Sequence, residues 1–421
     1  MVATQTNRYN TNISQISCPT GELGTDSHPW EQHQLGKVAE KVTEKNSGLA
    51  YQQVLTNSAT HGIVRQSEYF DRIVAGKNHL DAYYVVNPND YVYNPRISKE
   101  APCGPINRNT LELTGIASPL YLVFRVSSQS LAYEFLDQYF KTAKWFNYMK
   151  LQGNSGARSD RFTIADTDFF SIPVRIPSLP EQRCIGDFFS ILDNLIAAAE
   201  RQEALLRQKK QAYLQLMFPQ EDETEPRLRF AGFSGEWEQR QFGKLYAPSR
   251  EKNDGSFSAK DIISVAGMRY ASRETADSSD DYMKTYNVMR VGDIAFEGNR
   301  SGNFSHGRFV ENDLGDGIVS HVFVVLRPLP GRRYDLAFWK EAIHDEFLMR
   351  RILARSTKRS TMMHEIVVPD FLKETIRVPS LPEQQKIGRF FTKLDSTIAI
   401  SRKRVELLKK QKSAYLQSMF I

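Results

Sequence analysis

The sequence predicts a mixed α/β (α+β) fold, in which two similar globules are separated by two long helices that pair as an antiparallel coiled coil. Three observations support this prediction. The chain repeats itself at an offset of 202 residues, each repeat closes with a heptad-patterned segment, and each globule contains an apolar, β-branched stretch. A chain of 421 residues is also long enough for two or three domains.

The repeat is clearest in the segments that close each copy. Residues 176–218 and 378–420 are identical at 23 of 43 aligned positions, from (I/V)PSLPEQ to AYLQ(L/S)MF. The copies also open alike, because Trp30 is followed by EQHQLGK and Trp237 by EQRQFGK. The chain is therefore two copies of one unit, in which the helices are alike and the globules differ.

These landmarks divide the chain into six segments. They are an N-terminal extension (1–29), a first globule (30–177), a central helix (178–218), a linker (219–236), a second globule (237–379) and a C-terminal helix (380–421). The extension is polar and aperiodic, which predicts flexibility. The linker is acidic and begins next to a proline, as connecting segments often do.

One stretch is shared by the interiors of the two globules. Residues 115–125 and 317–327 align at the same offset and are rich in Val, Ile and Leu. Such a run predicts a buried strand, and it places His321 in the core.

Both closing segments carry the signals of a helix start. Ser178 and Ser380 stand three residues before Glu181 and Glu383, which predicts a capping box. A proline follows two residues after each serine, in the first turn, where a missing N–H costs little.

Apolar residues then recur at alternating spacings of three and four, which predicts a coiled-coil seam. The alternative is an amphipathic helix packed on its own globule, but one globule offers little surface for a helix this long. Lysines interrupt the seam at the matched positions 210 and 412. The residues predicted to form the seam, and through the helices a partner surface, are Ile185, Leu192, Ile196, Leu206, Tyr213, Ile387, Leu394, Ile398, Leu408 and Tyr415.

The amino-acid composition limits the classes of protein to which the chain can belong. Hydrophobic residues make up 41% and charged residues 25%, as in ordinary globular proteins, and no apolar run approaches the ~20 residues of a membrane span. Three cysteines without a CxxC pair predict reduced thiols and a cytoplasmic location. The net charge of +6 permits nucleic-acid binding without demonstrating it.

The sequence contains no recognisable catalytic motif. It lacks GxxxxGK[ST], GxGxxG after a strand, HExxH and GxSxG, and its eight histidines are scattered. We therefore expect a non-catalytic recognition or assembly component, without a metal site or a cofactor of its own.

The combination of repeats resembles the specificity subunit of type I restriction–modification enzymes. Two divergent globules are each followed by a near-identical helix with the motifs quoted above, and RLRFAGFSGEW at 227–237 resembles the stretch that introduces a target-recognition domain in that family. The resemblance covers nearly the whole chain from Trp30. The sequence departs from the family at its start, where a polar extension replaces the lead-in before Trp30.

The resemblance implies a function. Each globule would be a target-recognition domain that reads one half of a split, asymmetric double-stranded DNA target. The helices would form a spacer and dock two methyltransferase subunits, which bind S-adenosylmethionine and methylate adenine. Motor–nuclease subunits, which use ATP and Mg, would complete the restriction enzyme, and no membrane is involved.

Loops with Gly, Asn and basic residues occur at equivalent places in both copies. Glycine lets the backbone approach a phosphate or a base edge closely, and Arg, Asn and Lys are common DNA-contacting side chains. Each residue alone could equally be a solvated surface charge. The predicted DNA-binding residues are Arg96, Lys99, Arg158, Arg161, Asn299, Arg300, His306, Arg308, Lys358 and Arg359.

A second function remains open from the sequence. Two protein-binding globules on a coiled-coil stalk would make a structural adaptor that binds no nucleic acid. The salt dependence of duplex binding would separate the two functions, because phosphate-driven binding weakens steeply with salt.

Overall fold

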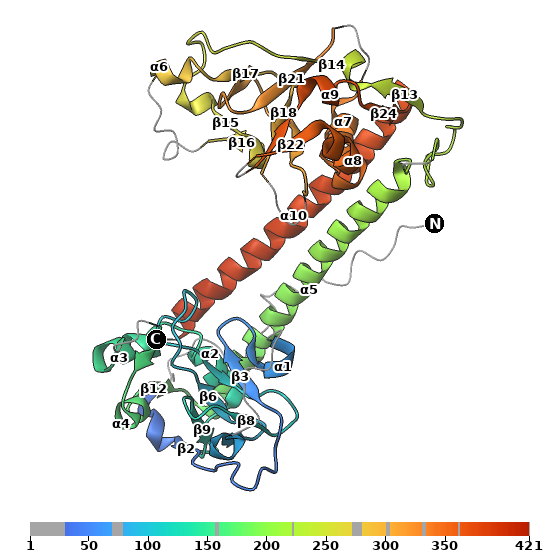
Figure 1. Ribbon diagram of the computed structural model, residues 1–421. Coiled ribbons are helices and arrows are strands. Elements are labelled where there is room, and N and C mark those ends of the chain that lie inside the picture. Colours follow the sequence, from blue (N-terminus) through green and yellow to red (C-terminus); the bar gives the residue numbers. More distant parts are fainter. Residues whose placement is uncertain are drawn as a thin grey trace, which may run out of the picture. The chain divides into compact units, whose positions relative to one another are not determined.

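The computed structural model describes residues 30–69, 79–155, 160–220, 223–271, 280–299, 304–330, 334–360 and 363–420. It forms two compact units. Unit 1 consists of Met1–Ala198 and Arg404–Ile421, and unit 2 of Ala199–Lys403. Two long helices, α5 (Leu179–Met217) and α10 (Leu381–Met419), each contribute a segment to both units (Figure 1).

Unit 1 contains the first globule. Its short helices are α1 (Gln66–Tyr69), α2 (Tyr133–Tyr139), α3 (Lys144–Gln152) and α4 (Asp166–Phe170). Its strands are β1 (Glu31–Gln34), β2 (Ala39–Lys41), β3 (Leu55–Ser58), β4 (Gly62–Arg65), β5 (Tyr84–Val86), β6 (Tyr91–Tyr93), β7 (Ile106–Arg108), β8 (Gly115–Ala117), β9 (Leu122–Val126), β10 (Asn154–Ser155), β11 (Phe162–Thr163) and β12 (Pro173–Ile176).

Unit 2 contains the second globule. Its short helices are α6 (Asp280–Met283), α7 (Leu336–His344), α8 (Glu346–Ser356) and α9 (Val368–Phe371). Its strands are β13 (Glu238–Gln241), β14 (Tyr246–Pro248), β15 (Ile263–Ser264), β16 (Arg269–Tyr270), β17 (Asn287–Met289), β18 (Ile294–Glu297), β19 (Arg308–Glu311), β20 (Gly317–Val319), β21 (Val324–Pro328), β22 (Thr357–Arg359), β23 (His364–Ile366) and β24 (Thr375–Val378).

The two globules share one topology. The central antiparallel sheet has the order β2-β9-β6-β7 in unit 1 and β14-β21-β18-β19 in unit 2. Smaller strand pairs also correspond, with β1–β12 matching β13–β24 and β10–β11 matching β22–β23. The prediction of two similar mixed α/β globules is confirmed, although their interior sequences are so different.

Both faces of each central sheet are buried, as the alternation of side chains along a strand requires. On β6, Tyr91 and Tyr93 face the larger core cluster of unit 1, whereas Val92 faces a smaller cluster on the opposite side. On β18, Ile294 and Phe296 face the larger cluster of unit 2 and Ala295 the smaller one. The sheet is therefore the middle layer of each unit.

The shared interior stretch is two strands, not one. In unit 1 a turn closed by the N–H of Tyr121 and the carbonyl of Ser118, at 2.9 Å, separates β8 from β9. In unit 2 the N–H of Phe323 donates to Ser320 in the same way, at 3.0 Å. His321 lies in this turn and is exposed, so its predicted place in the core is wrong.

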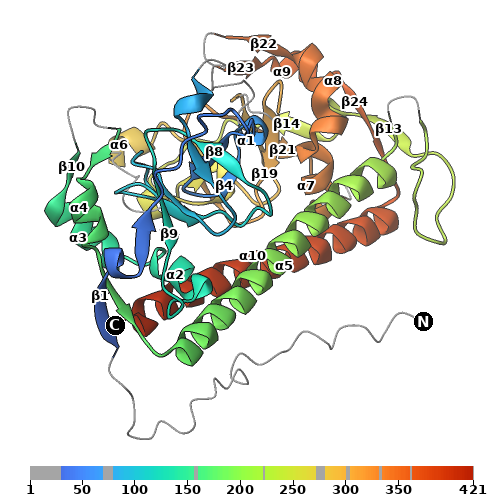
Figure 2. The same ribbon diagram turned by 90° about the horizontal axis from the view of Figure 1, so that it is seen from below.

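The long helices pack antiparallel within unit 1. The ring of Phe188 on α5 meets that of Tyr415 on α10, with centroids 5.0 Å apart, and Asp193 pairs with Lys412. Residue numbers therefore rise along α5 as they fall along α10. In both views a segment of α5 lies beside a segment of α10, which confirms the predicted antiparallel pairing (Figures 1 and 2).

The same contacts recur in unit 2, shifted by one repeat. Tyr213 meets Phe390 with centroids 5.0 Å apart, and the ammonium of Lys210 lies 2.7 Å from Asp395. Glu341 of α7 also accepts from Lys210, at 2.9 Å. The lysines that interrupt the apolar seam are thus members of ion pairs that join the two helices.

Each unit takes the closing segment of the other repeat into its core. Phe420, at the end of α10, lies in the core of unit 1 against Trp30, Phe135 and Phe189. Phe218, just after α5, lies in the core of unit 2. Its ring packs on three aromatic rings of that unit, those of Trp237, Phe338 and Phe391.

At one position the two sheets carry opposite charges. Arg108 lies opposite the first residue of β6 and donates to Asp137 of α2 at 2.7 Å. Glu311 lies opposite the first residue of β18, and within the described chain neither of its buried carboxylate oxygens has a hydrogen-bond partner. Burial raises the pKa of Glu311 to about 9.

Cys103 is a free, buried thiol. Among the described residues, none of the helices combines the length and apolarity needed to cross a membrane.

We expect Phe420→Ala to destabilise unit 1 by about 3–5 kcal/mol, because it empties a site enclosed by aromatic rings. Leu407→Ala, on an exposed position of the same helix, is the control and should change the free energy of unfolding little. Denaturant unfolding measures the cost, and hydrogen exchange should show faster exchange in unit 1. Equal effects of the two variants would contradict this account.

We expect the stability of unit 2 to fall as pH rises from about 5 to 9. In that window folded Glu311 holds a proton that the unfolded chain releases, so folding becomes less favourable with increasing pH. Glu311→Gln should remove this pH dependence and stabilise the protein at pH 8 by an amount on the order of a few kcal/mol. Thermal unfolding across this range, with the exposed Glu236→Gln as control, is the measurement. An unchanged slope in Glu311→Gln would refute the assignment.

Candidate nucleic-acid interface

Two of the predicted DNA-binding loops of unit 1 are joined through their backbones. Arg96, in the loop after β6, forms an antiparallel bridge with Arg161, just before β11. The N–H of Ile97 donates to the carbonyl of Asp160 at 2.9 Å, and the N–H of Phe162 donates to Pro95 at 2.8 Å. Residues far apart in sequence therefore form one basic junction, as their proposed common role requires.

A network of asparagines supports this junction. Buried Asn57 donates to the carbonyls of Val92 and Pro105, at 2.6 and 3.0 Å. Its own side-chain oxygen accepts from Asn107 at 2.7 Å, and its carbonyl accepts from Asn94 at 2.9 Å. Each buried amide is thereby satisfied, and the loop that carries Arg96 is fixed on the sheet. No pattern in the sequence pointed to Asn57 or Asn107, because their partners lie in other strands.

In unit 2 the loop after the corresponding central strand is also hydrogen-bonded to the last hairpin, but through different residues. The N–H of His364, on β23, donates to the carbonyl of Gly298 at 2.8 Å. A Cβ at position 298 would lie 1.9 Å from the carbonyl oxygen of His364, so only glycine permits this approach. The hairpin of β22 and β23, which carries Lys358 and Arg359, is thus held against the loop after β18.

The histidine and arginine of this loop have partners inside unit 2. The rings of His306 and His364 stack with centroids 5.2 Å apart. Arg308 donates to Glu297 at 2.7 Å and to the carbonyl of Ala266 at 2.8 Å, and it lies over the ring of Phe304. Its guanidinium is therefore largely occupied, which suits a role in shaping the loop.

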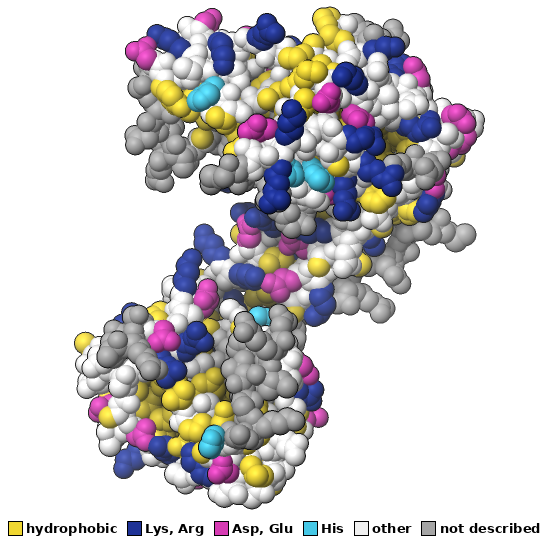
Figure 3. All heavy atoms as spheres, viewed as in Figure 1, with side chains coloured by type: hydrophobic (Ala, Val, Ile, Leu, Met, Phe, Trp, Pro, Cys, Tyr) yellow, Lys and Arg dark blue, Asp and Glu magenta, His cyan; other side chains and the backbone are white. Residues whose placement is uncertain are grey.

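The predicted DNA-binding residues differ in exposure. Arg96, Lys99, Asn299, Lys358 and Arg359 are exposed, whereas Arg161, His306 and Arg308 are partly buried. Arg158 and Arg300 lie outside the described residues. On the face of unit 2 that carries β22, histidine side chains lie beside Lys and Arg side chains (Figure 3).

The predicted seam residues lie inside the chain. Those that are buried are Ile185, Leu192, Ile196, Ile387, Ile398 and Leu408, and those that are half-buried are Leu206, Tyr213, Leu394 and Tyr415. The helices also carry apolar side chains that are exposed, which the sequence analysis did not single out. These are Ile191, Leu205 and Leu216 on α5 and Ile400 and Leu407 on α10. Their position off the heptad seam is the signal that could have identified them.

The repeated PSLPEQ motif joins each helix to its globule. The amide group of Gln182 donates to Ser130 at 2.8 Å and its oxygen accepts from the N–H of Ala132. Gln384 repeats the second contact, since its oxygen accepts from the N–H of Asp335 at 3.1 Å. Each helix is thereby fixed at the start of α2 or α7.

The glutamates of the motif do not behave as the predicted capping boxes. In unit 1 Glu181 accepts from the indole N–H of Trp30 at 3.1 Å. In unit 2 both carboxylate oxygens of Glu383 accept from Arg229, at 2.7 and 2.8 Å. Glu383 thereby gains a charged, two-pronged donor, which binds a carboxylate more strongly than a single neutral N–H does.

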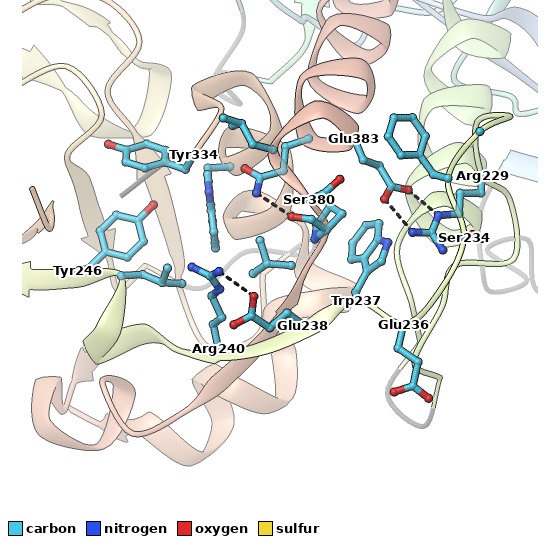
Figure 4. Close-up of a pocket in the computed structure, with 18 residues that line it drawn as sticks. Arg229, Ser234, Glu236, Trp237, Glu238, Arg240, Tyr246, Tyr334, Ser380 and Glu383 are labelled. Atoms are coloured by element: carbon cyan, nitrogen blue, oxygen red, sulfur yellow. Dashed lines mark hydrogen bonds and ion pairs between the residues drawn. The ribbon is translucent and has the colours of Figure 1, made fainter. Parts of the chain in front are cut away.

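Arg229 belongs to the lead-in segment that precedes the second globule. Figure 4 shows its guanidinium aligned with Glu383, beside Trp237 and Ser380. The segment and the start of α10 line a cavity of about 590 Å³. The contact with Glu383 raises the pKa of Arg229. The lead-in motif thus attaches the linker to the second helix.

The comparisons identify the second repeat. Residues 236–410 match the family described as "Type I restriction modification DNA specificity domain". This range contains the second globule and most of α10, and the internal repeat extends the same pattern to residues 30–218. No curated protein sequence matches the chain.

Two solved structures are similar over nearly the whole chain. A chain from a structure of complex assembly and conformational transition in a type I restriction–modification system has a TM-score of 0.55 at 15% identity, and the match covers 94% of this chain and 99% of that chain. The type I restriction–modification S subunit from M. genitalium has a TM-score of 0.55 at 11% identity, with 95% and 98% covered. At such identities the likeness shows the shared fold.

We expect Arg229→Ala to destabilise unit 2 by about 3–5 kcal/mol, because it leaves the buried Glu383 carboxylate without its counterion. The double variant Arg229→Ala/Glu383→Gln should recover part of this loss, since it buries no charge. Arg227→Ala is the matched control, because Arg227 is exposed and pairs with Glu223 on the same segment, a contact worth about 0.5 kcal/mol or less. Denaturant unfolding of the four proteins tests this. A double variant no more stable than Arg229→Ala would contradict the pairing.

Proposed function

Because residues 236–410 match the type I restriction–modification DNA specificity domain and the first repeat follows the same pattern, we propose that the chain is a specificity subunit of such a system. Each unit would read one half of a split DNA target through its loop junction. Unit 1 would use the junction of Arg96 with Arg161. Unit 2 would use the junction of Gly298 with His364 and the adjoining β22. DNA as the target also implies a cytoplasmic location.

One observation carries this proposal. In both units the loop after the central strand is hydrogen-bonded to the last hairpin, yet the side chains at this junction differ completely. Shared backbone geometry with different side chains is what two readers of different sequences need, because base edges are distinguished by side-chain hydrogen bonds. The half-sites should therefore differ in sequence.

The chemistry would belong to partners. The specificity subunit is a non-catalytic component of its complex, so adenine methylation and cleavage would be performed by two methyltransferase subunits and by motor–nuclease subunits. The exposed apolar side chains of α5 and α10 support docking of the methyltransferase subunits on the helices. In unit 1 they are Ile191 and Leu407, and in unit 2 Leu205, Leu216 and Ile400.

We expect Lys358→Ala/Arg359→Ala to weaken DNA binding through unit 2 only. If both side chains contact phosphates, the slope of binding against salt should fall by about two, and if one reads a base, discrimination in that half-site should fall by about 1–3 kcal/mol. Lys244→Ala/Lys393→Ala, two exposed lysines of the same unit, is the control.

The measurement is a salt series on duplex DNA, followed by methylation mapping in cells that carry the chain with its methyltransferase partner. A split, asymmetric methylated site that loses specificity in one half would support the proposal. A palindromic site, or duplex binding that is independent of salt, would overturn it.

A further inference from the structure

Unit 2 contains a groove whose lining residues are not among those proposed to read DNA. Its volume is about 690 Å³, and it is lined by one face of α8, by β13 and β24, and by the residues that follow α5. Four arginines line it, namely Arg350, Arg351, Arg355 and Arg377, and none of the lining side chains is acidic.

Two of these four arginines have no acidic partner inside the groove. Arg355 is paired with Glu374 at 2.6 Å, but within the described chain Arg350 and Arg377 have no carboxylate within salt-bridge distance. The described residues of the nearby linker do not supply a carboxylate to these arginines, because Glu223 pairs with Arg227 and Glu225 with Arg229. The groove is therefore a site of positive potential.

The groove also has an uncovered apolar element. The ring of Phe347, on α8, is 54% exposed although it is large and aromatic. Ile352 and Phe218, which also line the groove, are buried beneath the surface. Exposed aromatic residues beside arginines are the composition that is enriched in protein–protein interfaces.

We propose that this arginine groove binds an acidic peptide segment of a partner subunit. Its carboxylates pair with Arg350 and Arg377, and an apolar side chain of the segment covers Phe347. Arginine forms paired hydrogen bonds with carboxylates, so the match is geometric as well as electrostatic. The proposal rests on one part of the proposed function, namely that the chain works within a multisubunit complex.

Two observations favour a peptide over DNA. None of the residues predicted to bind DNA in unit 2 lines the groove. A duplex presents phosphates along its edge and keeps its thymine methyl groups inside the major groove, whereas a peptide can place a carboxylate and an apolar side chain next to each other.

The test uses the full chain and a short fluorescent peptide of Glu, Asp and Leu, with peptides in which Lys replaces the acids or Ser replaces Leu. Fluorescence anisotropy should show saturable binding of the acidic, Leu-containing peptide only. Arg350→Glu and Phe347→Ser should each weaken it about ten-fold or more, which corresponds to about 1.4 kcal/mol. Both residues are exposed, so the fold should survive, and circular dichroism checks this.

Lys358→Ala/Arg359→Ala is the matched control, because it removes two exposed charges outside the groove. It should leave peptide binding unchanged, while Arg350→Glu should leave duplex binding unchanged. Absent or non-saturable peptide binding, or binding that neither groove variant weakens, would refute the proposal. If Arg350→Glu weakens duplex binding as much as peptide binding, the groove is a DNA surface and the proposal is wrong. The duplex data on the control test the DNA-reading function independently.

Discussion

The exchange of helix ends is the constraint on which the rest of the structure depends. Each unit is completed by an aromatic residue from the closing segment of the other repeat, Phe420 in unit 1 and Phe218 in unit 2. Because these rings lie in the centre of an aromatic cluster, they cannot be removed without opening a cavity. The exchange requires the helices to run antiparallel, and the reciprocal ion pairs of Lys210 and Lys412 fix their register.

The repeated sequence can be understood from these contacts. Its glutamine ties the helix to the globule, its glutamate receives a donor from the opening segment, and its last phenylalanine enters a core. Each contact uses a residue of the helix motif. Because a change at any of these residues would remove its contact, the motif must be the same in both repeats for both scaffolds to form. The side chains of the loop junctions touch little of this scaffold, so they can differ between the units and suit different targets.

The two units also differ in the partners of their buried ionisable side chains. The basic Arg108 of unit 1 has a carboxylate partner, whereas Glu311 at the equivalent position in unit 2 is buried without one and holds its proton. Lys210 pairs with a second acid, Glu341. Lys412 instead lies near a second base, Lys141, which shares its partner Asp193. Burial lowers the pKa of Lys412 most, and the charge of Lys141 lowers it further. The same backbone therefore supports a paired arginine in one unit and a neutral, buried glutamic acid in the other.

The sequence by itself determined the repeat, the two long helices and the family resemblance, because heptad spacing and repeated motifs are local patterns. It also placed basic residues in loops that the structure brings together, as with Arg96 and Arg161. Only the tertiary structure showed the turn at His321, the partners of Glu181 and Glu383, the occupied guanidinium of Arg308 and the asparagine network around Asn57. Each of these depends on a partner in another element of the fold or on the solvent exposure of a turn. Hydrogen bonds between separate strands leave no periodic trace in a single sequence.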